Sequence, residues 1–293
     1  MISGRTRGQH KALDRFEVMG ELGQGAASRI LHIRDPESLQ HYALKIVIRR
    51  TAEEQKFLDQ AKHEYEVAQR FDHPALLKIF DIRVIRRWFR EREVRTLLEY
   101  VNGKSLEQIE KPPAELLVLV FAEAASAMSH MHQRGVFHAD LKPNNILVSQ
   151  SGQVKVIDFG LAWLRGSNKN RVQGTMGYLA PEQLRDRVVT EATDIYNFGA
   201  SMYRMFTGRT ASGAGSDVNI LPKRGIIIPT EELRPDLPQS LASVIDRCCE
   251  TKPHKRPQSM YEVGQILNAV AAELKVSNDL LPQLLRRRGD SPS

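Results

Sequence analysis

The sequence contains little cysteine and no long hydrophobic segment. Its two cysteines are Cys248 and Cys249, and because adjacent side chains on a predicted helix diverge, no structural disulfide is expected. The apolar run from Leu116 to Ala122 is far shorter than the roughly 18 residues of a membrane-spanning helix. Residues 1–12 are basic but include no apolar stretch, so we expect a basic tail there and no signal peptide. We therefore expect a cytoplasmic location and no membrane span.

Aromatic residues are also scarce, at 6%, whereas basic residues give a formal net charge of +7. The densest basic stretch, residues 83–95, holds six arginines. Because Glu91 and Glu93 interrupt it, an exposed hairpin with a solvated surface is favoured over a nucleic-acid site. Contact with a partner or an acidic substrate through Trp88 and Phe89 is the intermediate alternative.

Residues 138–160 contain four polar side chains at spacings that suit phosphoryl transfer. Asp140 is followed by a lysine two residues on (Lys142), an asparagine five on (Asn145) and an aspartate eighteen on (Asp158). Phosphoryl transfer needs a carboxylate that orients the attacking hydroxyl, a cation near the moving phosphoryl group, and oxygen ligands for Mg²⁺. These residue types match those needs in that order.

The sequence around these residues resembles the catalytic domain of eukaryotic-like (Hanks-type) Ser/Thr protein kinases. The resemblance spans roughly residues 14–274 and implies an α+β fold of two lobes. It implies a basic tail at 1–13, an N-lobe with a small antiparallel sheet and one main helix at 14–98, a hinge at 99–103, a helical C-lobe at 104–275, and a flexible basic tail at 276–293. A bacterial source is expected from the resemblance.

The glycine-rich loop of the family is matched by residues 22–30. Leu22, Gly23 and Gly25 fit the family pattern, and Ser28 replaces its third glycine. Glycine there lets the backbone approach phosphates closely. Lys45 follows on a strand predicted from the alternation of apolar residues through Val47, and the resemblance implies that it holds the α- and β-phosphates of ATP.

The partner of Lys45 is expected on the next helix, which the spacing of apolar residues predicts within 53–71. Glu64 and Glu66 are both candidates. Counting back ten residues from Pro74, as the family pattern requires, selects Glu64. Glu66 lies about 200° further round the helix and is expected to face water.

The resemblance also implies an adenine pocket and a set of supporting residues. Ile30 and Ala43 would cover adenine from one side and Leu147 from the other, with Leu98 guarding the pocket and the backbone of Glu99 and Val101 binding the ring. A plain core role remains open for Ile30, Ala43 and Leu147. Structural roles are implied for His138, Phe159, Gly160, Thr175, Glu182, Asp194 and Arg256. Among these, Glu182 should pair with Arg256, and Asp194 should hold the backbone of the catalytic loop.

One departure from the family bears on regulation. Ala139 stands where arginine usually precedes the catalytic aspartate. Because that arginine needs a phosphorylated activation loop to neutralise it, its absence predicts activity without such a phosphate. Thr175 is expected to bond Asp140 and Lys142, and Ser167 is the candidate site of autophosphorylation.

The implied activity is transfer of the γ-phosphoryl group of ATP to Ser or Thr hydroxyls of protein substrates in signalling. ATP and Mg²⁺ (or Mn²⁺) would bind between the lobes, with Asp140 as base, Lys142 steadying charge, and Asn145 and Asp158 as metal ligands. A binding or scaffolding pseudokinase is the first alternative, although Lys45, Asp140 and Asp158 are all present. A small-molecule kinase is the second, disfavoured by Lys142 and by the Ala-Pro-Glu segment at 180–182. A nucleic-acid partner is not expected, and the oligomeric state is open.

Overall fold

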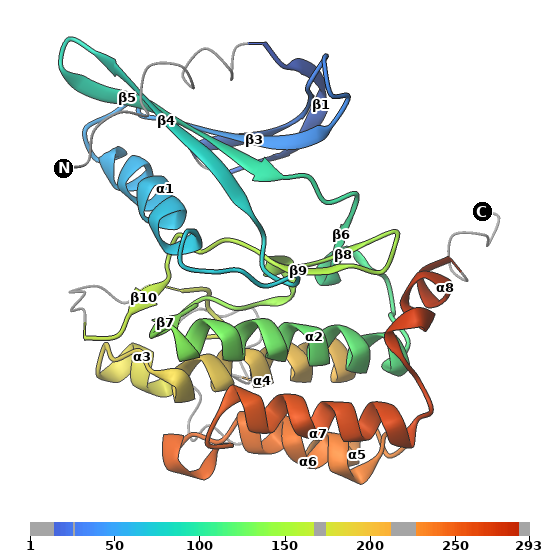
Figure 1. The fold of residues 1–293 in the computed structure, drawn as a ribbon. Coiled ribbons are helices and arrows are strands. Elements are labelled where there is room, and N and C mark those ends of the chain that lie inside the picture. The colour runs from blue at the N-terminus through green and yellow to red at the C-terminus, as the bar shows by residue number, and fades with distance from the viewer. Residues whose placement is uncertain (1–14, 26, 167–173, 212–226, 287–293) are drawn as a thin grey trace. The chain divides into compact units, whose positions relative to one another are not determined.

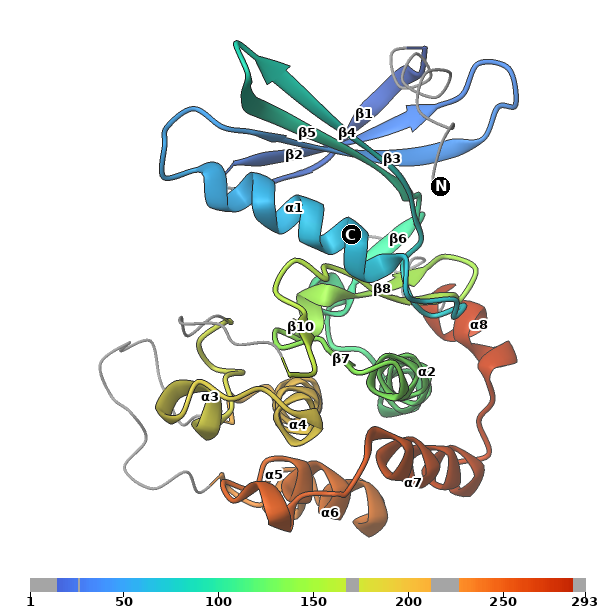
Figure 2. The same cartoon turned by 60° about the vertical axis from the view of Figure 1, so that its left-hand side comes forward.

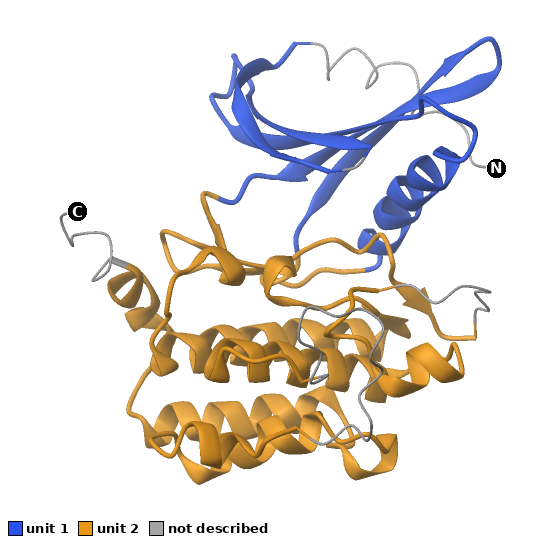
Figure 3. Ribbon diagram, turned by 180° about the vertical axis from the view of Figure 1, so that it is seen from behind, with its two compact units in different colours: residues 1–70, 77–101 blue, residues 71–76, 102–293 orange. Residues whose placement is uncertain are grey.

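The structure, a computed structural model, describes residues 15–25, 27–166, 174–211 and 227–286. The chain divides into two compact units, residues 1–70 with 77–101, and residues 71–76 with 102–293 (Figure 3). The division after residue 101 falls inside the predicted hinge at 99–103. The sequence had placed residues 71–76 in the N-lobe. They group with the second unit because the backbone of Ala75 and Leu76 pairs with strand β9 (Val154–Val156) of that unit.

Unit 1 is a five-stranded antiparallel sheet with one helix (Figure 1). Its strand order is β1-β2-β3-β5-β4. The elements are β1 (Glu17–Gln24), β2 (Ser28–Arg34), β3 (His41–Ile48), α1 (Gln55–Ala68), β4 (Ile79–Arg87) and β5 (Arg90–Glu99). The predicted helix and the predicted 83–95 hairpin are both confirmed.

Helix α1 packs on the sheet through its apolar stripe. Leu58 and Ala61 of the helix form a buried cluster with Val47 of β3 and Val94 of β5. Residues three or four apart share one face of a helix, so the spacing that predicted the helix also selects the side that is buried. Glu64, six residues after Leu58, lies on the buried side and is 3% exposed.

Unit 2 is mostly helical. Its helices are α2 (Ala114–Gln133), α3 (Pro181–Arg185), α4 (Glu191–Thr207), α5 (Thr230–Leu233), α6 (Gln239–Cys248), α7 (Met260–Glu273) and α8 (Leu281–Arg286). Short 3₁₀ segments cover Leu106–Gln108 (η2), Pro143–Asn145 (η3), Pro253–Lys255 (η4) and Asn278–Leu280 (η5). The strands β6 (Gly103–Ser105), β8 (Ile146–Ser149) and β9 (Val154–Val156) form one small sheet, and β7 (Val136–Phe137) pairs with β10 (Trp163–Leu164). The predicted α+β fold is confirmed.

Helix α2 is the central core helix of unit 2. It packs against α4 and α7, as the end-on view in Figure 2 shows. By length and composition it could also cross a membrane, but 72% of its most apolar stretch is buried inside the protein. Its apolar residues therefore have neighbours in the helical core.

Helices α4 and α6 approach each other closely at Gly199. A Cβ at this position would lie 2.4 Å from Cβ of Cys248, so only glycine permits the contact. Cys248 and Cys249 are both buried free thiols. Burial raises the pKa of Cys248 to about 12, so the thiol stays protonated and unreactive near neutral pH.

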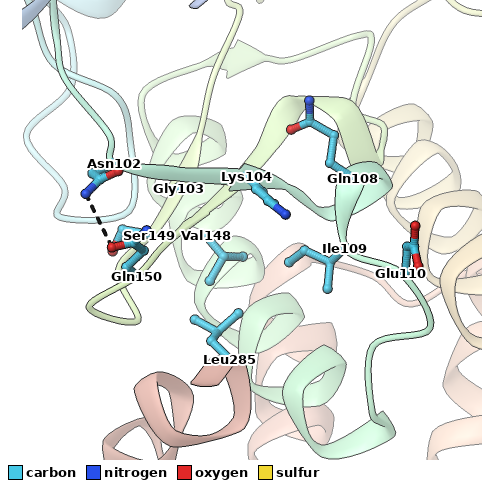
Figure 4. A pocket seen from close by; sticks show the side chains of 10 residues that line it. All are labelled: Asn102, Gly103, Lys104, Gln108, Ile109, Glu110, Val148, Ser149, Gln150 and Leu285. Atoms are coloured by element: carbon cyan, nitrogen blue, oxygen red, sulfur yellow. Dashed lines mark hydrogen bonds between the residues drawn. The ribbon is translucent and has the colours of Figure 1, made fainter. Parts of the chain in front are cut away.

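Part of the segment expected as a flexible tail, residues 276–293, forms helical turns in the structure. Residues 278–286 form η5 and α8, and Leu281 of α8 is 2% exposed. Leu285 lines a pocket of about 730 Å³ together with Ile109 and Val148 (Figure 4). Apolar contacts with the rest of unit 2 thus order residues 278–286, although the arginines at the end of this segment had suggested disorder. Residues 287–293, like the expected tail at 1–13, lie outside the described residues.

Candidate active site

The predicted ion pair of unit 1 is present. Lys45 Nζ lies 2.6 Å from Oε2 of Glu64, whose side chain is 3% exposed, while that of Lys45 is 19% exposed. Glu66 is exposed, as the helical geometry predicted. Because β3 fixes the lysine backbone and α1 fixes the carboxylate, the cationic group is held in one place.

The residues implied for adenine binding in unit 1 share one face of its sheet. Ile30 opposes Lys45 across β2 and β3, and Ala43 opposes Leu98 across β3 and β5. Directly opposed residues of antiparallel strands point to the same face, and alternation puts Ala43 and Lys45 on that face too. Ala43 and Leu98 are buried. The N–H of Glu99 donates to the carbonyl oxygen of Lys78, at 2.9 Å, so this N–H is not available to a ligand.

The glycine-rich loop connects β1 to β2. Leu22 and Gly23 lie at the end of β1, and Leu22 is 48% exposed. The N–H of Gly25 donates to the carbonyl oxygen of Ser28, at 2.8 Å. A Cβ at Gly25 would lie 2.7 Å from Oγ of Ser28, so a larger residue at position 25 would require the Ser28 side chain to rotate. Residue 26 is outside the described residues.

The catalytic loop of unit 2 brings Asp140, Lys142 and Thr175 together. Lys142 Nζ donates to Asp140 Oδ2, at 3.0 Å, and to Thr175 Oγ1, at 2.6 Å. The expected bond from Thr175 to Asp140 is not formed, which corrects the prediction on that point. Lys142 stands between the two side chains and takes both oxygens as acceptors, so Thr175 reaches the aspartate only through the lysine.

The other oxygen of Asp140 differs from the first in its hydrogen bonding. Asp140 is 7% exposed, and its Oδ1 is buried without a hydrogen-bond partner among the described residues. A buried carboxylate oxygen without a donor is costly, and such atoms usually have a functional explanation. A substrate hydroxyl would supply the missing donor.

Asn145 and Asp158 lie beside each other in unit 2. The carbonyl oxygen of Asn145 accepts a hydrogen bond from the N–H of Ile157, at 2.9 Å. Ile157 directly precedes Asp158, so this bond brings the backbones of Asn145 and Asp158 close together. Asn145 Nδ2 donates to the carbonyl oxygen of Asp140, at 2.9 Å, so the amide is oriented with its nitrogen on the loop and its oxygen left as a ligand atom. Asp158 is a non-glycine residue with a φ of 67°, a costly conformation that functional sites retain.

The donor set suits Mg²⁺. An amide oxygen and a carboxylate are hard oxygen ligands, and Mg²⁺ usually takes one or two protein ligands together with waters and phosphate oxygens. Among the described residues, no group of three or more His, Cys, Asp or Glu side chains could hold a metal ion. An Asn–Asp pair completed by nucleotide phosphates does not require such a group.

Asp194, at the start of α4, holds the backbone of the catalytic loop. Its Oδ2 accepts the N–H of His138, at 2.7 Å, and its Oδ1 accepts the N–H of Ala139, at 2.8 Å. This is the anchoring role that the resemblance implied. The carbonyl oxygen of Ala139 accepts Gln183 Nε2, at 2.9 Å, so both backbone groups of Ala139 are fixed while its φ is 67°.

His132 of α2 is a partner of Asp194 that sequence reasoning missed. Its Nε2 lies 2.8 Å from Asp194 Oδ2, and its Nδ1 lies 3.1 Å from Glu191 Oε1, an ion-pair distance without hydrogen-bond alignment. Burial lowers the pKa of His132, but the two carboxylates outweigh it and raise the pKa to about 9. His132 is therefore a buried cation at neutral pH. Its position six residues before the loop was the only signal in the sequence.

The predicted pair of Glu182 and Arg256 is also present. Arg256 donates to Glu182 through Nη1, at 2.7 Å, and through Nη2, at 3.0 Å. Gln183 and Asn197, which sequence reasoning did not single out, form a separate buried pair, in which Asn197 Nδ2 donates to Gln183 Oε1, at 3.0 Å. These residues support the activation segment and the loop.

His138 and Phe159 pack inside unit 2, as expected. Both are fully buried, and their rings meet edge to face with centroids 6.0 Å apart. Phe71 packs on the other edge of Phe159, with centroids 5.5 Å apart. The N–H of Gly160 donates to Asp158 Oδ1, at 3.4 Å. Ser167, the expected autophosphorylation site, lies outside the described residues.

Comparison with known proteins agrees with this geometry. The sequence pattern of the protein kinase domain family matches residues 16–269. The chain belongs to the protein kinase family. A probable serine/threonine-protein kinase of Clostridium acetobutylicum is 31% identical over 270 residues, covering 88% of this chain and 40% of that protein.

Two further relatives of this kinase are also serine/threonine-protein kinases. PrkC of Bacillus subtilis is 28% identical over 87% of this chain and 40% of its own length. PknB of Mycolicibacterium smegmatis is 28% identical over 88% of this chain and 43% of its own length. The chain thus carries a protein kinase domain, and it spans less than half the length of these relatives.

Proposed function

We propose that this kinase transfers the γ-phosphoryl group of Mg·ATP to Ser or Thr hydroxyls of protein substrates. The observation that carries the proposal is the state of Asp140. One oxygen is held by Lys142, and the other is buried without a donor. This is what a group that must accept one proton from an incoming hydroxyl requires.

The chemistry assigned to these residues is simple. The substrate hydroxyl binds to Oδ1 of Asp140, which orients it and finally takes its proton. The hydroxyl oxygen forms the new bond to the γ-phosphorus while the bond to the ADP oxygen breaks. Lys142 is fixed by Asp140 and Thr175, and its ammonium would stabilise negative charge on the moving group.

Mg²⁺ would be held by Asp158 and the amide oxygen of Asn145. When bound, it neutralises charge on the phosphates. The oriented amide of Asn145 and the hydrogen-bonded carboxylate of Asp158 support this assignment. Mn²⁺ is an alternative with the same ligand preference.

Unit 1 would supply nucleotide binding. The Lys45–Glu64 pair gives a fixed cation for the α- and β-phosphates. Ile30, Ala43 and Leu98 give an apolar face for the adenine ring, and the Glu99 carbonyl and Val101 backbone would bind its edge. Leu147 lies on β8 of unit 2, and its contact with adenine remains a prediction.

We also propose that the enzyme is active without a phosphate on its activation segment. Ala139 is buried, and its backbone is fixed on both sides by Asp194 and Gln183. No buried cation at this position calls for an anionic partner. Autophosphorylation at Ser167, a role in signalling, and a reducing cytoplasmic location suited to two free thiols belong to the same proposal.

The test is transfer of labelled γ-phosphate to the protein and to a mixed Ser/Thr/Tyr peptide library, with Asp140→Asn beside the wild type. Asp236→Asn is the matched control, because that aspartate is 61% exposed and pairs with a surface arginine. Label on Ser or Thr that is lost in Asp140→Asn and kept in the control supports the proposal. ATP binding without transfer in the wild type would instead favour a scaffold.

A second variant tests unit 1 separately. Lys45→Met removes the fixed cation and leaves Glu64 buried without its partner. We expect a large loss of transfer together with weaker ATP binding, whereas Asp140→Asn should lose transfer and keep ATP binding. Equal effects of both variants on ATP binding would contradict the division of roles.

A further inference from the structure

The turn between β4 and β5 exposes two aromatic side chains. The strands end at Arg87 and begin again at Arg90, so the turn consists of Trp88 and Phe89 alone. Trp88 is 83% exposed and Phe89 is 100% exposed. Figure 1 shows this teal-coloured hairpin extending to the outer end of unit 1, beyond the labelled part of its sheet.

The turn breaks the ordinary rules for a hairpin. Trp88 has a φ of 52° and Phe89 a φ of 64°. Two-residue turns with two positive φ angles strongly prefer Asn-Gly or Asp-Gly, and bulky residues there are strained. Arg87 and Arg90 stand directly opposite each other across the strands, where like charges repel. Three unfavourable choices at one place point to a use for the exposed side chains.

The acidic residues of the hairpin do not neutralise its tip. Glu91 is engaged by Lys62 and Arg86, and Glu93 by Arg95. Arg87, Arg90 and Arg92 are exposed, and none of their guanidinium groups makes an ion pair or hydrogen bond with another described residue. The tip thus combines two apolar rings with uncompensated positive charge.

We propose that this tip binds an anionic membrane surface. Trp88 and Phe89 enter the interfacial region, where aromatic rings are favoured, and Arg87, Arg90 and Arg92 contact lipid headgroups. A narrow convex tip offers far less area than the roughly 800 Å² per partner of a standard protein interface. A lipid surface needs no matching pocket, so it fits this shape better than an acidic protein does.

The fluorescence of Trp88 can report binding at this tip. It has two tryptophans, of which Trp163 is 8% exposed and Trp88 is 83% exposed. Insertion should therefore shift the emission of Trp88 to the blue while Trp163 changes little. The measurement is a titration with phosphatidylcholine vesicles that contain 30% phosphatidylserine, set against pure phosphatidylcholine, together with co-sedimentation.

Two variants separate the apolar and ionic contributions. Trp88→Asn with Phe89→Gly installs the preferred turn residues, so it should fold at least as well as the wild type while binding at least tenfold more weakly. Arg87→Ser with Arg90→Ser and Arg92→Ser should weaken binding about 100-fold, at about fivefold per arginine. Tyr261→Asn, which removes an aromatic side chain that is 61% exposed on α7, is the control and should bind normally.

The outcomes are distinct. Salt-sensitive binding to the anionic vesicles that both hairpin variants lose, with unchanged phosphorylation of a soluble peptide, supports the proposal. Binding that survives Trp88→Asn with Phe89→Gly overturns it. No vesicle binding, combined with a Trp88 emission shift on adding poly-glutamate, would overturn it and assign the tip to an acidic protein.

Discussion

Two buried aspartates of unit 2 illustrate the difference between a reactive carboxylate and a structural one. Asp194 has three donors around its two oxygens, two backbone N–H groups and the His132 ring. Asp140 has one donor, Lys142, and one oxygen without any partner among the described residues. Their burial is similar, so exposure does not distinguish them. The two aspartates differ in how many hydrogen bonds their carboxylate oxygens accept.

The two ion pairs predicted from the sequence differ in the same way. Arg256 binds Glu182 through two nitrogens and its side chain is 0% exposed. Lys45 meets Glu64 through one short contact, and the lysine is 19% exposed. A planar guanidinium locks a carboxylate in place, whereas an ammonium is a compact charge that a phosphate can also reach. The first pair suits a scaffold and the second a ligand site.

The largest effect is expected from exchanging the reactive carboxylate. Asp140→Asn keeps the shape and removes the proton acceptor, so the rate of phosphoryl transfer should fall about 1,000-fold. Since the amide oxygen of asparagine can still accept the hydrogen bond from Lys142, the unfolding temperature should change little. Steady-state kinetics and calorimetry on one preparation measure both. A loss below tenfold would end the reactive assignment.

For the structural carboxylate, Asp194, we expect the main effect of a substitution on stability. Asp194→Ala leaves two backbone N–H groups and a buried His132 cation without their acceptor. We expect a loss of about 3–5 kcal/mol in the free energy of unfolding, measured by urea denaturation. If stability were unchanged while the rate fell, the distinction between the two aspartates would be wrong.

The pH dependence of stability sharpens the same comparison. The pKa of His132 is raised from 6.5 to about 9 in the folded protein. A raised histidine pKa stabilises the fold fully below the unfolded value, near pH 6.5, and this stabilisation disappears as the pH rises through about 9. The contribution is about 3 kcal/mol at most.

The measurement is the free energy of unfolding from pH 6 to pH 10, for the wild type and for His132→Gln. Taking the difference between the two proteins removes the titrations that they share. This difference in the free energy of unfolding should shrink with rising pH. A difference independent of pH would show that His132 is neutral in the folded protein.

The smallest effect is expected at Thr175, which reaches Asp140 only through Lys142. Thr175→Ala removes one acceptor from the lysine and should lower transfer about tenfold, near 1.4 kcal/mol. Thr175→Ser keeps the hydroxyl and should retain most of the activity. Full activity in the alanine variant would show that Asp140 alone positions Lys142.

Much of the site was predictable because it is local in sequence. Asp140, Lys142 and Asn145 lie on one short loop, so their spacing alone places them together. Glu64 was selected over Glu66 by the family's spacing to Pro74, and helical geometry predicted only that Glu66 faces water. The pair of Glu182 and Arg256 was found only through the family resemblance, since 74 residues separate its members.

Other features could not be found this way. His132, Gln183 and Asn197 are ordinary residues in helical patterns, and their buried hydrogen bonds exist only because α2, α3 and α4 meet under the loop. The order of the 278–286 segment likewise depends on apolar contacts made far away in the sequence. The bond expected from Thr175 to Asp140 failed because Lys142 occupies the position between them.

The sequence by itself determined the family, the α+β class, and the residue types that phosphoryl transfer requires, because motif spacing and apolar periodicity are local properties. Only the tertiary structure decided which acceptors are satisfied. Hydrogen bonding of a buried carboxylate depends on groups that distant segments bring within 3 Å, and no local pattern records it. That is why two aspartates that look alike in the sequence differ in the folded protein.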